Sequence, residues 1–379
     1  MRRKVVYAMM AFSCVLGFLY VYCNVPLRTA IYRSFAKQTV YLVCEADTIY
    51  SFGYFGVRKS LINRDNGEIK LLVENDDFCH NCFVGRLIGR SGAINGDYLY
   101  VAARSYLGGR YKSSNKNYLK GKFLVMCKRN LHVIKEIPVD YSMIEAKIYG
   151  KNLVISGLQG FNIYDISCPA NPHLVYSYRT EEAHEYQGCD FWETDQCIYL
   201  AFARFDCGLS IYDITNPKQP ELVKDISIQD TLVNGTVLPD GLHAFRLVIK
   251  YPYIIATLAP KRNHIGTEAD VRGLWICDIS DLNQIKKYAV EIPRDEFYST
   301  MTGDPQPSHI AMYNNRIYVN FCEKGFAIFS MSDDPSNIKF IRTVDFTNGK
   351  TILPITIDEK GWLFGGSFDN EKIYTYKLQ

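Results

Sequence analysis

The stretch Gly208-Leu-Ser-Ile-Tyr-Asp-Ile-Thr215 occurs, with variations, at three other places in the chain. Each copy has a glycine, a short run rich in β-branched and aromatic residues, and a polar ending, which is typical of a strand that leads into a turn. The other copies are Gly160-Phe-Asn-Ile-Tyr-Asp-Ile-Ser167, Gly273-Leu-Trp-Ile-Cys-Asp-Ile-Ser280 and Gly325-Phe-Ala-Ile-Phe-Ser-Met-Ser332. Strand repeats at intervals of roughly 45 to 65 residues indicate sheets arranged around an axis, as in a β-propeller.

The repeat extends in both directions into units of four predicted strands. In the best-formed unit we expect strands at Tyr186 to Glu193, Cys197 to Ala203, Leu209 to Ile214 and Glu221 to Ile228. Three further units and a degenerate one follow the same order, and they begin at Ile144, His243, His309 and Arg86. The 28 Tyr and 21 Phe residues, together with many β-branched residues, favour strands throughout.

The C-terminal unit supplies only three strands, at Leu353 to Ile357, Trp362 to Ser367 and Ile373 to Leu378. A propeller leaves exposed sheet edges unless its ring closes, and closure commonly takes a strand from the other terminus. Glu68 to Glu74 is the candidate for that strand. We therefore predict an all-β fold, a six-bladed β-propeller of four-stranded antiparallel blades closed by an N-terminal strand. Val40 to Tyr54 is then left over, so seven blades is the alternative.

The segment Val5 to Cys23 carries no charge and follows Arg2, Arg3 and Lys4. About 20 apolar residues cross a bilayer as a helix, with basic residues preferred at the cytoplasmic end. A cleaved signal peptide is the competing interpretation, but bulky residues stand where a cleavage site needs small ones. We expect residues 1–37 to form an uncleaved signal anchor with one hydrophobic helix and a linker, and residues 38–379 to form an exported propeller domain.

The charge of the chain is nearly balanced, because Lys and Arg total 43 and Asp and Glu total 40. Proteins that bind nucleic acid concentrate basic residues on one face or in a tail. The sequence shows no such concentration, so we predict no nucleic-acid partner.

Twelve cysteines are present, and Cys79-His-Asn-Cys82 contains the most closely spaced pair beyond the apolar segment. A redox or zinc site would need a thioredoxin-like surrounding or a second such pair, and the sequence has neither. An exported domain permits disulfides. We expect either a small structural disulfide between Cys79 and Cys82 or two free thiols.

The repeats end in Asp-Ile-Ser or Asp-Ile-Thr at Asp165, Asp213 and Asp278. A short acceptor side chain at the end of a strand can bond the backbone N–H groups of the following turn. We interpret these carboxylates as structural rather than catalytic. Ser330 replaces Asp in the fourth copy, which a turn tolerates more readily than an active site does.

The units GFNIYDISCPANPHLV at 160–175 and GLSIYDITNPKQPELV at 208–223 resemble LVIVD repeats. These repeats form propellers and are found largely in exported or surface proteins of bacteria. The resemblance implies a propeller and a location in the bacterial cell envelope. Together with the apolar segment, this leads us to expect a propeller anchored in the membrane by residues 5–23. It implies no reaction and supplies no catalytic motif.

The long connections are predicted to gather on one face of the propeller. In an antiparallel four-stranded blade, the 2–3 loops and the crossings to the next blade emerge together, opposite the 1–2 and 3–4 turns. Loops on a rigid scaffold are where binding residues concentrate. The candidate ligand-binding residues at this face are Arg104, His184, Glu185, Arg204, His243 and His309.

Two functions fit these residues. The first is a binding or interaction module whose partner is a protein, peptide or glycan, with no cofactor. The alternative is a metal-dependent envelope hydrolase or lyase in which His184, His243 and His309 hold a divalent metal at the mouth of the central channel. No Ser-His-Asp order, Gly-rich phosphate loop or HExxH motif is present, so the sequence favours the binding module.

Overall fold

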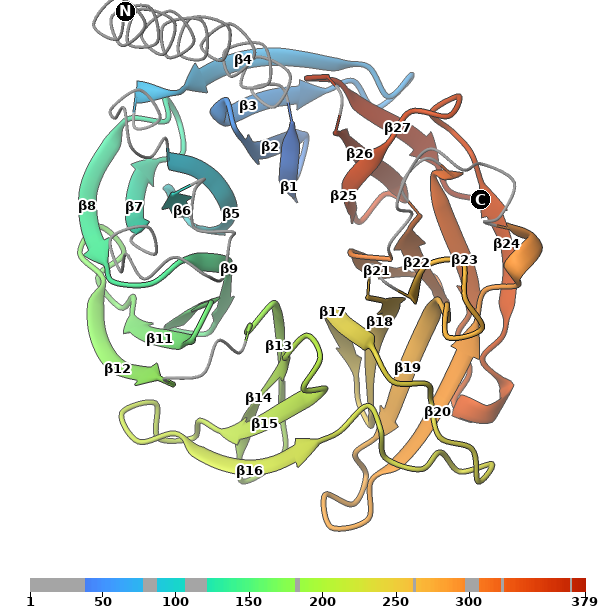
Figure 1. The fold of residues 1–379 in the computed structure, drawn as a ribbon. Helices are drawn as coiled ribbons and strands as arrows, with labels where there is room; N and C mark the ends of the chain where they lie inside the picture. Colours follow the sequence, from blue (N-terminus) through green and yellow to red (C-terminus); the bar gives the residue numbers. More distant parts are fainter. Residues whose placement is uncertain are drawn as a thin grey trace, which may run out of the picture.

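A computed structural model of the chain describes residues 38–77, 87–105, 121–180, 185–261, 264–296, 307–321, 324–368 and 370–379. Seven antiparallel sheets surround a central axis in this part of the chain, so the fold is a seven-bladed β-propeller (Figure 1). The expected hydrophobic helix at residues 5–23 lies outside the described residues. Among the residues described, no helix is both long enough and apolar enough to cross a membrane.

Blades 1 to 3 each have four strands. Blade 1 contains β1 (Thr39–Glu45), β2 (Thr48–Gly53), β3 (Gly56–Ile62) and β4 (Ile69–Asn75). Blade 2 contains β5 (Leu87–Asn95), β6 (Tyr98–Ser105), β7 (Gly121–Cys127) and β8 (Val133–Val139). Blade 3 contains β9 (Met143–Tyr149), β10 (Asn152–Gly157), β11 (Gly160–Asp165) and β12 (His173–Arg179).

Blades 4 to 6 also have four strands, and blade 7 has three. Blade 4 contains β13 (Gly188–Glu193), β14 (Ile198–Ala203), β15 (Leu209–Asp213) and β16 (Glu221–Ile226). Blade 5 contains β17 (Leu242–Lys250), β18 (Tyr253–Pro260), β19 (Gly273–Asp278) and β20 (Lys286–Glu291). Blade 6 contains β21 (Ile310–Tyr313), β22 (Arg316–Asn320), β23 (Phe326–Ser330) and β24 (Phe340–Val344). Blade 7 contains β25 (Ile352–Ile357), β26 (Trp362–Ser367) and β27 (Ile373–Lys377). Short 3-10 helices occupy Arg294–Glu296 and Pro335–Asn337.

The prediction of six blades is wrong, and so is the predicted closure by an N-terminal strand. β4, which contains most of the segment Glu68 to Glu74, pairs with β3 of blade 1 and leaves blade 7 three-stranded. β3 is not recognisable from the sequence, because Gly56–Ile62 carries Arg58 and Lys59 and lacks the repeat. With β3 present, the leftover segment from Val40 becomes a complete blade. The strands expected in blades 4 and 7 are confirmed to within two residues at every end.

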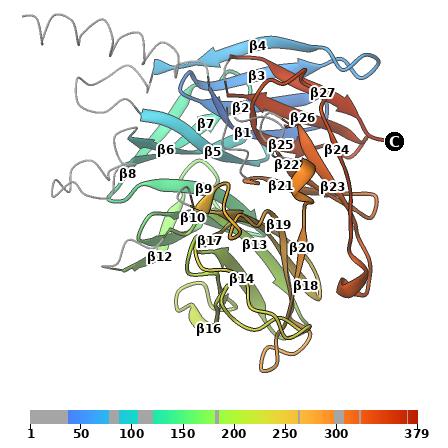
Figure 2. The same cartoon turned by 45° about the vertical axis from the view of Figure 1, so that its right-hand side comes forward.

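Side-chain packing closes the ring in place of an exchanged strand. β1 lies against β25 (Figure 2). Leu42, Ile49 and Ile62 of blade 1 form one buried cluster with Phe364 of blade 7. Arg58 Nη2 also lies 3.0 Å from a carboxylate oxygen of Glu371 in blade 7. Blades 1 and 7 therefore pack on each other as other neighbouring blades do.

Each junction between neighbouring blades holds its own apolar cluster in the described structure. In β14, Leu200 and Phe202 pack toward blade 3, whereas Ala201 and Ala203 pack toward blade 5. Because successive strand residues point to opposite faces, a middle strand of a blade must be apolar on both. This requirement explains the continuous apolar run from Ile198 to Ala203.

The interpretation of the Asp residues as turn acceptors is confirmed. The backbone N–H of Ser167 donates to Asp165 Oδ1 at 2.8 Å, and that of Thr215 donates to Asp213 Oδ1 at 2.8 Å. Ser280 donates in the same way to Asp278 at 3.0 Å. The hydrogen bonds that Asp165 accepts from Ser167 lower the pKa of Asp165.

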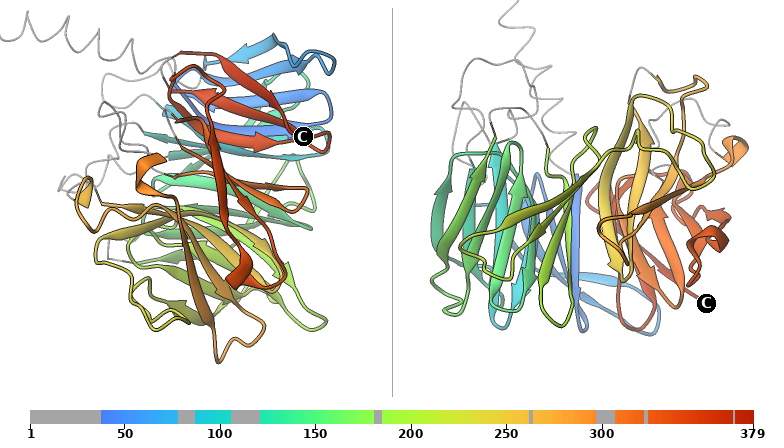
Figure 3. Two further views of the ribbon diagram at one scale, coloured as in Figure 1. Left: turned by 90° about the vertical axis from the view of Figure 1, so that its right-hand side faces the viewer. Right: turned by 90° about the horizontal axis from the view of Figure 1, so that it is seen from below.

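Strand direction gives the propeller two different faces, seen edge-on in Figure 3. We call the face at which the second and fourth strands of each blade end the crossover face, and the opposite one the turn face. All the 2–3 loops and inter-blade crossings leave from the crossover face. The turn face carries the 1–2 and 3–4 turns, which contain Lys151 and Lys218.

Candidate functional site

The first strand of each blade is innermost and lines the axis (Figure 1). Five of these strands, β1, β5, β9, β17 and β25, have a shift of pairing register near their start, at the crossover face. In β5 the pairing jumps from Gly89 to Ser91, and in β17 it jumps from Ala244 to Leu247. A bulge takes residues out of the ladder and re-aims their side chains. Arg90 and Arg246 occupy these bulges.

Arg90 and Arg104 belong, with Arg246, to a basic cluster at the crossover end of the first and second strands. Arg104 pairs with Ile88 near the end of β6, beside the bulge of β5. In the part of the chain that the structure describes, neither guanidinium makes a hydrogen bond or ion pair, and Arg90 Nε is buried without a partner. Burial lowers the pKa of Arg90 to about 9, and repulsion from Arg104 and Arg246 adds to the effect. Burial likewise lowers the pKa of Arg104.

Glu185 is the carboxylate that faces these two arginines. An isolated bridge with Leu158 of blade 3 fixes its backbone, and its carboxylate accepts a hydrogen bond from Gln187. Burial raises the pKa of Glu185 to about 7, although Arg104 and Arg90 act in the opposite direction. Near neutral pH this carboxyl group therefore carries only part of a negative charge. It compensates the two arginines incompletely.

A second carboxylate, Glu145 of β9, lies deeper in the channel and is fully engaged. Its Oε2 lies 2.7 Å from Arg246 Nη1, and both side chains are more than nine-tenths buried. Tyr41 donates its hydroxyl hydrogen to Glu145 Oε1 at 3.1 Å, and the Cys189 N–H donates to Oε2 at 2.8 Å. These groups border a cavity of about 290 Å³, whose polar lining also includes Lys147 and His309.

His309 contributes a neutral imidazole to this cavity. Its Nδ1 lies 3.2 Å from Ser308 Oγ, and its Nε2 is buried without a hydrogen-bond partner among the described residues. Burial lowers the pKa of His309 well below its ordinary value, and Arg246 and Arg90 lower it further. The ring is therefore uncharged at neutral pH.

His243 has different surroundings. Its ring lies 3.5 Å, centroid to centroid, from that of Phe205. Burial lowers the pKa of His243 to about 4, and nearby Lys261 adds to this shift. His184 lies outside the described residues. Across the residues that the structure describes, no group of three or more His, Cys, Asp or Glu side chains could hold a metal ion.

Arg204 is paired within its own blade. Its Nη1 donates to Ser210 Oγ at 2.8 Å and to Asp225 Oδ1 at 3.0 Å. The guanidinium also lies over the ring of Tyr186, at 5.3 Å from its centroid. The structure thus brings Arg104 and Glu185 together with Arg90 and leaves Arg204 engaged elsewhere.

The expected Cys79–Cys82 pair lies outside the described residues. Cys44, Cys127, Cys168, Cys189, Cys197 and Cys277 are free thiols. Burial raises the pKa of Cys189, so this thiol is not a ready nucleophile.

Sequence reasoning missed Arg90, Glu145 and Arg246. A signal for them was present, because each is a charged residue between apolar residues in the first half or the middle of a first strand. In a propeller such a residue is either exposed or turned toward the axis. The β-bulges decide between these two orientations, and the bulges cannot be predicted from the sequence.

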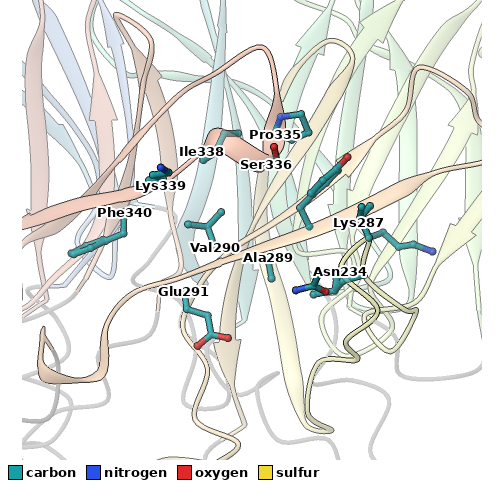
Figure 4. Close-up of a pocket in the computed structure, with 13 residues that line it drawn as sticks. Asn234, Lys287, Ala289, Val290, Glu291, Pro335, Ser336, Ile338, Lys339 and Phe340 are labelled. Atoms are coloured by element: carbon teal, nitrogen blue, oxygen red, sulfur yellow. The ribbon is translucent and has the colours of Figure 1, made fainter.

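A groove of about 490 Å³ lies at the rim, where β20 borders the 3–4 connection of blade 6 (Figure 4). Its lining includes Val290, Ile338 and Phe340. Lys287 Nζ lies 3.1 Å from Asp230 Oδ2. The backbone carbonyl of Lys287 accepts a hydrogen bond from the Val233 N–H at 2.9 Å. The polar groups of Lys287 are therefore already engaged, and we take the channel mouth, where buried arginines lack partners among the described residues, as the better candidate site.

Comparison with known proteins supports the architecture. Residues 146–180, which cover most of blade 3, match the LVIVD repeat family. The chain carries an LVIVD repeat. This LVIVD repeat spans β10, β11 and β12 completely, and so includes the Gly160 copy of the motif. No curated protein is significantly similar to the chain in sequence.

Solved structures share the propeller at low sequence identity. The WD40 β-propeller domain of Doa1 is 11% identical with a TM-score of 0.57, over 90% of this chain and 94% of that one. U3-55K is 9% identical with a TM-score of 0.57, over 90% and 96%. The computationally designed Ika8 protein is 9% identical with a TM-score of 0.52, over 91% and 98%. At these identities the similarity concerns the fold alone.

Proposed function

We propose that this LVIVD-repeat propeller is a binding module that receives a protein, peptide or glycan at its crossover face. The observation that carries this proposal is the polar channel mouth, where Arg90 and Arg104 lack partners among the described residues. A core that served only stability would pair or exclude such groups. The long connections leave from the same face, which makes it the natural place for recognition.

We further propose that the protein works in the bacterial envelope, held in the membrane by residues 5–23. The uncharged segment after Arg2, Arg3 and Lys4 supports this location. Protease treatment of intact and of opened spheroplasts would test it. We expect the propeller to be digested in intact spheroplasts and to sediment with membranes after alkaline washing; protection of the propeller until the membrane is opened would contradict the proposal.

The binding face can be tested with two matched charge-reversal variants. Lys261→Glu/Lys350→Glu changes two lysines at the crossover face, and Lys151→Glu/Lys218→Glu changes two exposed lysines at the turn face. The full chain in detergent would be screened on arrays of peptides and glycans. Each variant would then be tested on the saturable hits by surface plasmon resonance.

We expect the crossover-face variant to weaken binding by about tenfold or more, and the turn-face variant to bind as the unaltered chain does. Loss of binding in the turn-face variant alone would contradict the proposal. An absence of any saturable hit would also count against a peptide or glycan partner.

A further inference from the structure

We propose that Arg90 and Arg104 form an anion site that binds a carboxylate or phosphate group of the ligand. This inference rests on the proposed function and names the ligand chemistry that the channel mouth recognises. Its basis is a charge imbalance at one place in the fold. Three arginines, at positions 90, 104 and 246, lie within electrostatic range of one another. Glu145 neutralises one of them, Arg246.

Within the described structure, the carboxyl group that acts electrostatically on both remaining arginines, Arg90 and Arg104, is that of Glu185. This group makes no ion pair with either arginine. A buried or half-buried guanidinium without partners is costly, and folded proteins normally pair it. An anion supplied by a ligand would provide the missing partner.

The chemistry of the side chains selects the kind of anion. A guanidinium presents planar, forked donors that match the two oxygens of a carboxylate or phosphate. Arg104 lies opposite Ile88 on the adjacent strand, beside the bulge that contains Arg90, so the two guanidinium groups come from neighbouring positions and can bind the same anion. The neutral His309 lies within electrostatic range of Arg90 and has a free Nε2, so it can take part in a hydrogen bond without adding charge.

Glu185 makes the site sensitive to pH. The charged groups within range of its carboxyl are Arg104, Arg90 and Asp206, and Gln187 donates a hydrogen bond to it. When Glu185 is ionised it competes with the ligand for the arginines. When it is protonated the competitor disappears, so anion affinity should rise as the pH falls from about 8 to about 6.5.

The test is to measure, by titration calorimetry, the binding of malonate and of inorganic phosphate to the full chain in detergent. We expect Arg90→Met and Arg104→Met each to weaken binding of the preferred probe by about tenfold or more. Arg204→Met is the matched control, since Arg204 also follows a second strand but is paired with Asp225. We expect it to leave the affinity unchanged. The preferred probe distinguishes a carboxylate ligand from a phosphate ligand.

Two further measurements separate a binding defect from misfolding. Without anion, Arg104→Met should unfold at a temperature no lower than the unaltered chain, because the substitution removes an unpartnered charge. Glu185→Gln should bind malonate more tightly at about pH 8 and should lose most of the pH dependence.

The inference would be overturned if the Arg90 and Arg104 variants bound malonate and phosphate with the same affinity as the unaltered chain. It would also be overturned if the unaltered chain bound neither anion. If the Lys261→Glu/Lys350→Glu variant still lost its peptide or glycan ligand, the proposed function would stand without the anion site.

Discussion

Arg104 and Arg204 follow nearly identical strand endings, VAAR and AFAR, yet their surroundings differ. Arg204 has Asp225 of β16 within 3.0 Å. In blade 2 the register places Phe123 and Ile137 where blade 4 has Ser210 and Asp225, and Arg104 makes no ion pair within the described residues. The role of an arginine at this position is thus decided by two residues, on the third and fourth strands, which are 6 and 21 residues away in the sequence in blade 4.

The stability of the chain should depend on the ionisation of Glu185. Its pKa is raised to about 7 in the folded chain, so the unfolded chain loses the proton at lower pH. Between about pH 4.5 and pH 7 the folded state therefore binds more protons, and stability falls as pH rises, by up to about 3 kcal/mol. We expect Glu185→Gln to remove this loss, measured as the difference in urea unfolding free energy between the two proteins at each pH.

The two proteins must be compared with each other at each pH, because His243 changes the free energy of unfolding with pH in the opposite direction to Glu185. Its pKa is lowered to about 4, so its contribution to stability increases with pH up to about 6.5. His243 is present in both proteins and cancels. A difference between the two proteins that stays constant from about pH 4.5 to about pH 7 would contradict the assignment to Glu185.

At the scale of the strand, a steric contact explains why each repeat begins with glycine. A Cβ atom on Gly208 would lie 2.1 Å from the carbonyl oxygen of Ile226, on the neighbouring outermost strand. The glycines of the other three copies face the same clash, with the carbonyls of Tyr178, Val290 and Val344. Strand three thus starts so close to the end of strand four that no side chain fits.

Gly208→Ala should lower the free energy of unfolding by about 2 to 4 kcal/mol, because the chain must move apart at this contact as well as hold a positive φ. Gly235→Ala is the control: Gly235 has a φ of +81°, close to the +85° of Gly208, but open space around its Cβ position. It should cost about 1 kcal/mol. Equal losses in urea unfolding would show that backbone conformation alone requires the glycine.

At the scale of the whole molecule, the ring closes by packing between blades 1 and 7. Phe364 is fully buried in the cluster at that junction, and Phe329 is fully buried between blades 5 and 6. Both belong to the same kind of interface, although the chain is continuous only across the second. Closure therefore needs no special device beyond the burial of apolar surface.

Phe364→Ala should lower the free energy of unfolding by about 3 to 5 kcal/mol, as Phe329→Ala should, since both leave a large cavity in a packed interface. Unfolding in urea, followed by circular dichroism, measures both. A loss below about 1 kcal/mol for Phe364→Ala alone would indicate that blades 1 and 7 are not tightly packed on each other.

The amino-acid sequence by itself determined the repeating strand, the order of strands within blades 2 to 7 and the turns at Asp165, Asp213 and Asp278, because these depend on neighbouring residues. It also pointed to the correct face for Arg104 and Glu185, since strand order alone decides which ends lie together. Only the tertiary structure decided the number of blades, because β3 has three consecutive polar residues, Arg58 to Ser60, and is held as a strand by its partners on both sides. It likewise decided which charged residues meet at the axis, because Arg90 and Arg246 are directed there by bulges, and the pairing of distant strands sets a bulge.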